Sequence, residues 1–248
     1  MSKGTRDRSA RDRLADERRL QDQRDRQKRR LGVAAGAVVL IVAAVVITIL
    51  VNNSRGKSEK YAGAIAPATR QADGSIVMAN AGVTAPVLEI FEDFQCPACR
   101  NLEKTSGNTV KRLAAEGKVK VVYRPFRLFT QEPTRGNSER AANAALCAPA
   151  DRWVRYHDLI FSHQPAETSP GFANDDLVGW GGEAGITGSA FESCVTKGEK
   201  NAQVQQMTDY ATNVGKVSQS PTVKLDGKEI TAKAFVPGEL EKAISAAK

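Results

Sequence analysis

The stretch from Val87 to Lys104 reads VLEIFEDFQCPACRNLEK and carries two closely spaced cysteines. Its first part, up to Phe91, is rich in β-branched and aromatic residues, which favours a buried strand. A polar turn follows, and Pro97 suits the first position of a helix, so that Cys96 falls at the N-cap. The stretch therefore predicts a strand, a tight turn and a helix that begins at a cysteine.

A cysteine at a helix N-terminus faces unpaired backbone N–H groups and the positive end of the helix dipole, and both favour thiolate over thiol. Cys99 lies one turn further into the predicted helix, close enough to attack a mixed disulfide formed at Cys96. The sequence Cys96-Pro97-Ala98-Cys99 thus predicts reversible dithiol chemistry, with no cofactor beyond the redox-active disulfide.

The chain also contains a long apolar segment. Residues 31–51 read LGVAAGAVVLIVAAVVITILV, 21 residues without a charge, and a helix of this length spans about 32 Å, enough for a hydrocarbon core of about 30 Å. Lys28-Arg29-Arg30 precede it and Asn52-Asn53-Ser54 follow, so the positive-inside rule places the N-terminus in the cytoplasm. A cleaved signal peptide is the alternative, but its apolar region would be shorter and a small-residue cleavage site would follow directly.

Charge and composition divide the chain further. Residues 1–30 hold 12 Lys or Arg against 6 Asp or Glu, whereas the whole chain has a net charge of +8. The basic charge therefore belongs to a cytoplasmic tail, and nucleic-acid binding is not predicted. Residues 52–71 are polar and small and predict a linker. The sequence thus predicts a single-pass plasma-membrane protein with an extracytoplasmic domain over 72–248.

The four cysteines allow three pairings, and an even number outside the cytoplasm favours disulfides. Half of a zinc site is an alternative for the close pair, but Cys147 and Cys194 are 47 residues apart and the only histidines are His157 and His163. These histidines are typical of helix-packing or surface positions, so no metal site is predicted. An inert disulfide within the close pair also remains open.

A second motif lies near the C-terminus. Ser220-Pro221-Thr222-Val223 starts a predicted strand, and Asp226-Gly227 between apolar segments indicates a hairpin turn. A proline at the start of such a strand is either an edge residue or a cis bend.

Together these motifs resemble the DsbA-like branch of the thioredoxin superfamily. The resemblance covers about residues 75–248 and implies an α/β fold of the thioredoxin type with a helical insertion over about 135–213. It implies that Pro221 is a cis-proline packed against the cysteine pair and that Ser220 offers backbone groups to an extended substrate strand. It rests on Phe94-Gln95-Cys96-Pro97-Ala98-Cys99, Val119-Lys120-Val121-Val122-Tyr123 before Arg124-Pro125-Phe126, Trp153-Val154-Arg155-Tyr156-His157-Asp158, Ser220-Pro221-Thr222 and the Asp-Gly hairpin.

The resemblance implies an extracytoplasmic thiol–disulfide oxidoreductase. Its substrates would be unfolded or reduced secreted proteins, and a quinone-linked membrane protein of the DsbB or vitamin K epoxide reductase-like type would reoxidise it. A disulfide reductase or isomerase on the same fold, and a peptide-binding, chaperone-like module, remain alternatives, because direction depends on redox poise and partners.

Within the insertion, Cys147 and Cys194 follow helical stretches, and we expect a structural disulfide between them. Closing a loop of this length constrains the unfolded chain by about 4 kcal/mol. The large aromatic residues of this segment are expected in its core; they are Trp153, Tyr156, Phe161 and Trp180.

Two positions depart from the family pattern. Ala98 stands where members often carry a histidine that stabilises the thiolate, which predicts a weaker oxidant. Ile90 stands six residues before the first cysteine, where many members have a buried acid. Glu89 through a strand bulge, or Glu92 or Asp93 from the turn, could take that role as a proton-relay acid; alternatively, all three are solvated.

Overall fold

The computed structural model describes residues 61–247. The predicted cytoplasmic tail, the predicted span over 31–51 and the first part of the predicted linker lie outside the described residues. Within 61–247, no helix is long and apolar enough to cross a membrane.

The elements are β1 (Ala68–Arg70), β2 (Ile76–Met78), β3 (Val87–Glu92), α2 (Pro97–Leu102), the π-helix η1 (Glu103–Gly107), α3 (Asn108–Ala115), β4 (Lys120–Pro125), α4 (Thr134–Cys147), α5 (Ala150–Ser162), α6 (Asn174–Glu183), α7 (Ser189–Thr196), α8 (Asn201–Asp209), the π-helix η2 (Tyr210–Val214), β5 (Thr222–Leu225), β6 (Lys228–Glu229), α9 (Thr231–Ala234) and α10 (Pro237–Ala246).

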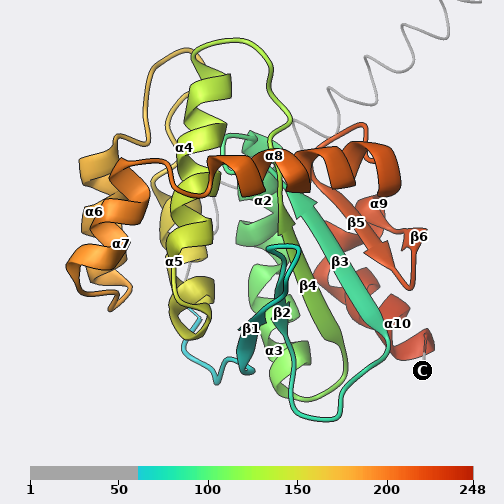
Figure 1. Ribbon diagram of the computed structural model, residues 1–248. Helices are drawn as coiled ribbons and strands as arrows, with labels where there is room; N and C mark the ends of the chain where they lie inside the picture. Colours follow the sequence, from blue (N-terminus) through green and yellow to red (C-terminus); the bar gives the residue numbers. More distant parts are fainter. Residues whose placement is uncertain (1–60, 248) are drawn as a thin grey trace, which may run out of the picture. The chain divides into compact units, whose positions relative to one another are not determined.

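The strands form a single sheet in the order β1-β2-β4-β3-β5-β6. β3 and β4 are parallel, with Leu88 opposite Val121, and the other neighbouring strands are antiparallel. Both central strands therefore end at the same side of the sheet, and α2 begins there (Figure 1). This arrangement brings the cysteine pair to the carboxyl end of the central strand.

Alternation along β3 explains its burial on both faces. Leu88 and Ile90 join the main core, whereas Phe91 points to the other face and packs with Phe126 and Val217. Successive side chains of a strand point to opposite faces, so the buried Glu92 shares the face of Leu88 and Ile90.

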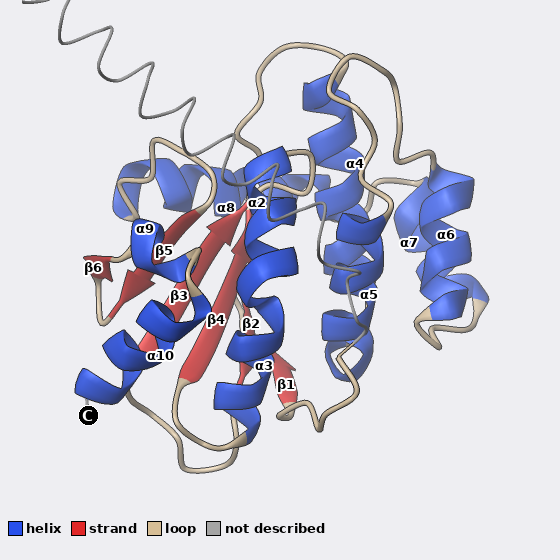
Figure 2. Ribbon diagram, turned by 180° about the vertical axis from the view of Figure 1, so that it is seen from behind, coloured by secondary structure: helices blue, strands red, loops and turns tan. Residues whose placement is uncertain are grey.

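Helices cover both faces of the sheet. α2, α3, α9 and α10 lie over one face, and α8 crosses the other, while α4 to α7 stand beside the sheet near β1 (Figure 2). This is the expected thioredoxin-like α/β fold, and the helices α4 to η2 fill the segment predicted as the helical insertion.

The interior of the insertion matches the expectation from its aromatic residues. Trp153, Tyr156 and Phe161 are buried, and the Tyr156 hydroxyl donates a 2.8 Å hydrogen bond to the carbonyl of Leu177. Trp180 is only partly buried and stacks on the His163 ring at 4.5 Å. The insertion thus has an aromatic core that is continuous with that of the sheet.

The folded domain starts earlier than the predicted boundary at residue 72. β1 lies within the segment predicted as a linker, yet it pairs with β2, and Ala66 is buried. The guanidinium of Arg70 donates a 2.7 Å hydrogen bond to the carbonyl of Ala148, just after α4. The sequence does not reveal this short edge strand, because its three residues carry no apolar alternation and are held by backbone pairing with β2 and by the long-range bond of Arg70.

Candidate active site

The cysteine pair lies where β3 ends and α2 begins. Cys96 is the N-cap of α2, with an extended backbone at φ −76° and ψ 118°, and Pro97 is its first helical residue. Both thiols are free; Cys99 is fully buried, whereas Cys96 keeps 6% of its surface exposed. Pro97 and Ala98 are exposed, so an incoming thiol can approach Cys96 but not Cys99.

Ser220 contacts both sulfurs from the loop before β5. Its carbonyl accepts a 3.1 Å hydrogen bond from the Cys96 thiol, and its hydroxyl lies 2.9 Å from the Cys99 sulfur. The same hydroxyl accepts a 3.0 Å bond from the backbone N–H of Asp93. The Ser220–Pro221 peptide bond is cis, as the resemblance implies. The two motifs that are far apart in the sequence therefore form one site.

The two thiols differ in acidity because their surroundings differ. The Cys99 thiol and the backbone N–H groups of Cys99 and Ala98 lower the pKa of Cys96, although burial and the charge of Asp93 oppose this. Burial, the neighbouring Cys96 and the charge of Glu92 raise the pKa of Cys99 well above its usual value. Cys96 is thus the better nucleophile, and Cys99 holds its proton.

Asp93 anchors the turn that carries the pair. One carboxylate oxygen accepts a 2.9 Å bond from the backbone N–H of Gln95, and the other accepts 2.8 Å bonds from Leu128 N–H and the Ser138 hydroxyl. Burial raises the pKa of Asp93 to about 6, while these donors oppose the rise. The carboxylate therefore ties the turn to the loop after β4 and to α4.

Below the pair, five ionisable side chains from four elements form a cluster in which only Asp158 is partly exposed. Glu92 Oε1 lies 2.8 Å from His157 Nε2, and His157 Nδ1 lies 3.3 Å from Asp158. Lys111 Nζ is 2.7 Å from Asp158 and 3.9 Å from Glu103. Burial lowers the pKa of His157, but the acids around it, Glu92 above all, outweigh burial and raise the pKa to about 10. Burial raises the pKa of Glu103 to about 7.

This cluster corrects two sequence expectations. His157 is buried in a helix, as expected. However, the carboxylates of Glu92, Glu103 and Asp158 lie around it, and the sequence gives no sign of this grouping. The solvated alternative is wrong for Glu92 and Asp93, which are fully buried. Glu89 is only partly exposed and pairs with Arg124 at 2.9 Å. The alternation of Leu88, Ile90 and Glu92 is the one sequence signal that predicts the side on which Glu92 lies.

Among the described residues, Glu92, Glu103 and His157 are also the group that could hold a metal ion, since their ligand atoms lie within 4.8 Å of one another. A Cβ at residue 107 would come within 2.5 Å of the Glu103 carboxylate, so Gly107 makes room for that side chain. Lys111 already supplies a positive charge beside Glu103, which opposes a divalent cation there.

The remaining two cysteines form a disulfide. Cys147 at the end of α4 is bonded to Cys194 in α7, with a Cα–Cα distance of 5.9 Å and a separation of 47 residues. The bond therefore joins two helices of the insertion and leaves Cys96 and Cys99 as the free pair.

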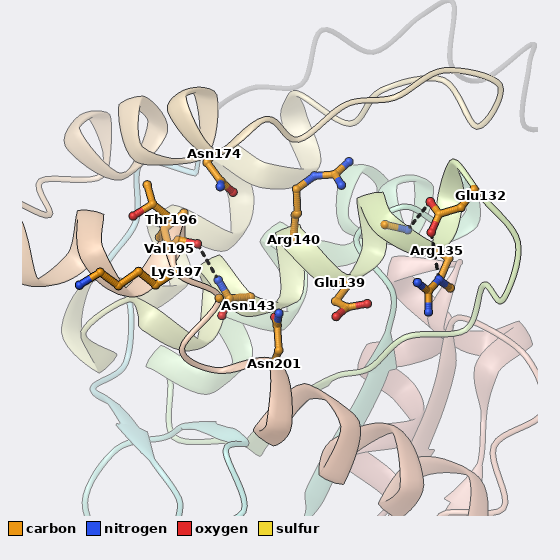
Figure 3. A pocket seen from close by; sticks show the side chains of 12 residues that line it. Glu132, Arg135, Glu139, Arg140, Asn143, Asn174, Val195, Thr196, Lys197 and Asn201 are labelled. Carbon is orange, nitrogen blue, oxygen red and sulfur yellow. Dashed lines mark hydrogen bonds and ion pairs between the residues drawn. The ribbon is translucent and has the colours of Figure 1, made fainter.

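A polar cavity of about 380 Å³ lies in the insertion (Figure 3). None of its lining residues belongs to residues 93–99, here called the cysteine loop. Its polar groups hold the insertion together: Asn143 donates to the carbonyl of Val195 at 3.1 Å and accepts from Lys200 N–H at 2.9 Å, and Arg140 donates to the carbonyl of Gly171 at 2.7 Å. We therefore assign it no part in the chemistry of the pair.

Comparisons with known proteins agree with this geometry. A family model described as Thioredoxin matches residues 79–246. The disulfide bond oxidoreductase DsbG of Mycobacterium tuberculosis is 28% identical, over 73% of this chain and 93% of that one, with a TM-score of 0.55. DsbA of the same organism is 26% identical, over 75% and 100%, with a TM-score of 0.54.

A third structure, the thiol-disulfide oxidoreductase MdbA of Corynebacterium diphtheriae, has a TM-score of 0.61 at 20% identity, over 76% of this chain and 97% of that one, and supports the fold. No curated protein matches the chain significantly. The fold and the cysteine pair define a thiol–disulfide oxidoreductase of the DsbA type. The chain belongs to the thioredoxin family.

Proposed function

We propose that the chain introduces or exchanges disulfides in reduced or unfolded secreted proteins through Cys96 and Cys99. In the oxidising direction a substrate thiolate attacks Cys96 of the Cys96–Cys99 disulfide. That bond breaks, Cys99 leaves as a thiolate and takes up a proton, and the substrate is joined to Cys96. A second substrate thiolate then attacks the substrate sulfur of this mixed disulfide and releases Cys96 as a thiolate. The substrate leaves oxidised, and the enzyme keeps two electrons as a dithiol.

The observation that carries this proposal is that the pKa values of the two thiols shift in opposite directions, although both sulfurs contact Ser220. A thiol with a low pKa is a good leaving group, and its thiolate is the stable species in the reduced enzyme. A thiol with a high pKa is a poorer leaving group, but once released it takes up a proton, and the protonated thiol does not attack the mixed disulfide again. The geometry thus supports attack at Cys96 and release of Cys99.

Glu92 is the acid that best fits proton exchange with Cys99. Its charge acts on Cys99, and its Oε2 is buried without a hydrogen-bond partner. Glu89 is engaged by Arg124, and Asp93 uses both oxygens to accept bonds from fixed donors. Glu92 is therefore proposed as the proton-relay acid.

The proposal includes a location and partners. The charge-free run at 31–51 and the basic residues before it support a plasma-membrane anchor with the domain outside the cytoplasm. Disulfides form and persist in such compartments, which agrees with the Cys147–Cys194 bond. Turnover there requires a reoxidant, for which a quinone-linked membrane protein of the DsbB or vitamin K epoxide reductase-like type is proposed. The reduction potential of the pair, set against that of its partner, decides between oxidase and reductase.

The decisive experiment is trapping of the mixed disulfide. In the Cys99→Ala variant the substrate stays joined to Cys96, because no internal thiol can release it. We expect covalent complexes with an unfolded, disulfide-bonded protein on non-reducing gels for Cys99→Ala, because its Cys96 thiolate opens a substrate disulfide and stays joined to one of the two sulfurs. We expect none for Cys96→Ala. The reverse pattern would show that Cys99 is the attacking sulfur. Binding of unfolded protein without any covalent complex in either variant would support a chaperone-like module instead.

A further inference from the structure

Two glutamines join the cysteine loop to the helical insertion. The side-chain amide of Gln164 donates to the carbonyl of Phe94 at 2.6 Å and to the carbonyl of Cys96 at 2.9 Å. In return, the buried amide of Gln95 donates to the carbonyl of Pro165 at 3.2 Å. Both hydrogens of the Gln164 amide are thus used on the two carbonyls that flank Gln95.

The segment that carries Gln164 is itself held in place. It is the loop between α5 and α6, here called the 163–173 loop. At one end the His163 ring stacks on Trp180. Further along, Asn137 donates to the carbonyl of Ser169 at 3.0 Å, and Arg140 donates to the carbonyl of Phe172 at 3.1 Å. Because α4 and α6 hold the loop, Gln164 is a fixed support for the cysteine turn.

The carbonyl of Cys96 matters because its direction sets the backbone of the N-cap. Cys96 has ψ 118°, and its carbonyl accepts only one bond from its own helix, at 3.2 Å from Arg100 N–H. This N-cap conformation places the sulfur at the N-terminus of α2, where the Cys99 thiol and the backbone N–H groups of Cys99 and Ala98 stabilise its thiolate. No side chain at position 98 can replace them, since that residue is alanine.

We propose that Gln164 is a positioning residue of the redox site, which holds the carbonyls of Phe94 and Cys96 and so keeps the Cys96 sulfur on the N–H groups of α2. The helical insertion thereby sets the reactivity of the pair. This inference rests on the proposed function, because it concerns the sulfur that attacks substrate.

The test compares three variants by thiolate absorbance against pH and by the reduction potential of the pair. Gln164→Met keeps the length of the side chain and removes both hydrogen bonds, so the pKa of Cys96 should rise. The thiolate population at pH 7 should fall about tenfold, which lowers the potential by about 30 mV. Gln164→Glu should have a larger effect, since a carboxylate repels both carbonyls and adds a negative charge beside the sulfur.

Thr168→Glu is the matched control, because it places the same charge on an exposed residue of the same loop, and it should leave both quantities unchanged. The inference is overturned if both Gln164 variants keep the wild-type pKa and potential. A lower unfolding midpoint with an unchanged pKa would overturn it too, since Gln164 would then only stabilise the loop. None of these measurements uses a substrate, so failure of mixed-disulfide trapping is distinguishable from failure of this inference.

Discussion

Cys96 and Cys99 carry the same thiol, and their different chemistry comes from a few neighbouring atoms. Cys96 receives hydrogen bonds at a helix N-terminus, whereas Cys99 lies in the core beside an acid. Ala98 adds a backbone N–H but no charge, so the Cys99 thiol and the backbone N–H groups of α2 lower the pKa of Cys96 without help from a charged side chain at position 98. The expectation of a weaker oxidant than a histidine-containing relative stays a prediction.

Glu92 provides a prediction at the residue scale. Release of a small thiol from a mixed disulfide at Cys96 requires Cys99 to lose its proton. Glu92→Gln removes the proton acceptor, so the rate of release should fall by about a hundredfold near pH 7. In this variant the rate should then increase about tenfold for each unit by which the pH is raised. Because the charge of Glu92 also opposes ionisation of Cys99, the pH profile is the measurement that tests the relay. Glu89→Gln, on the other face of β3, is the control and should keep the wild-type profile; an unchanged profile in Glu92→Gln would contradict the assignment.

The same variant should change how stability depends on pH. The pKa of His157 is about 10 in the fold, above the ordinary value of 6.5. A raised pKa contributes stability that is fully present below pH 6.5 and is lost as pH rises through 10. Glu92→Gln lowers the pKa of His157 in the folded state. The free energy of unfolding of this variant should therefore fall less steeply with pH, between pH 6.5 and pH 10, than that of the wild type. Denaturant titrations at three pH values measure the slope.

At the scale of elements, the Cys147–Cys194 bond closes the helical insertion onto itself. It joins α4 to α7, two helices that do not carry the redox pair. Replacing both by serine should cost about 4 kcal/mol, which lowers the melting temperature by roughly 10 °C for a domain of this size. Thiol-exchange activity at 25 °C should change little, because the N-terminus of α2 is untouched.

Calorimetry and an exchange assay on the same preparation check both halves of that prediction. Alkylation of gently reduced wild-type protein should label Cys96 and Cys99 only. Loss of activity in a double variant that is still folded would show that the disulfide supports the redox site directly.

For the whole molecule, the open question is where the domain lies relative to the membrane. The basic tail before the apolar run predicts an external domain. Protease added to intact spheroplasts should digest the domain from residue 52 onward and spare residues 1–30. Lysed spheroplasts, in which the tail is digested as well, are the control. Protection of the domain in intact spheroplasts would place the redox pair in the cytoplasm and contradict the proposed substrates.

Local patterns predicted a large part of this fold correctly. The buried run before Cys96, the turn at Asp226 and the strand that β4 forms all depend on neighbouring residues. β1 was missed because short edge strands carry no clear side-chain signal. The sequence leaves the burial of Glu92 and Asp93 open, because a polar residue at the end of a strand is buried or solvated according to what packs over it.

The sequence alone places a cysteine at a helix N-terminus, because the strand, the turn and Pro97 act within a few residues of one another. It also marks the second motif at Ser220-Pro221. Only the tertiary structure brings Ser220 to both sulfurs across more than 120 residues, Glu92 to His157 across 65, and Gln164 to the Cys96 carbonyl across 68. Hydrogen bonds and burial, which set the acidity of the two thiols, act over a few ångströms in space, and sequence distance does not reveal which groups come that close.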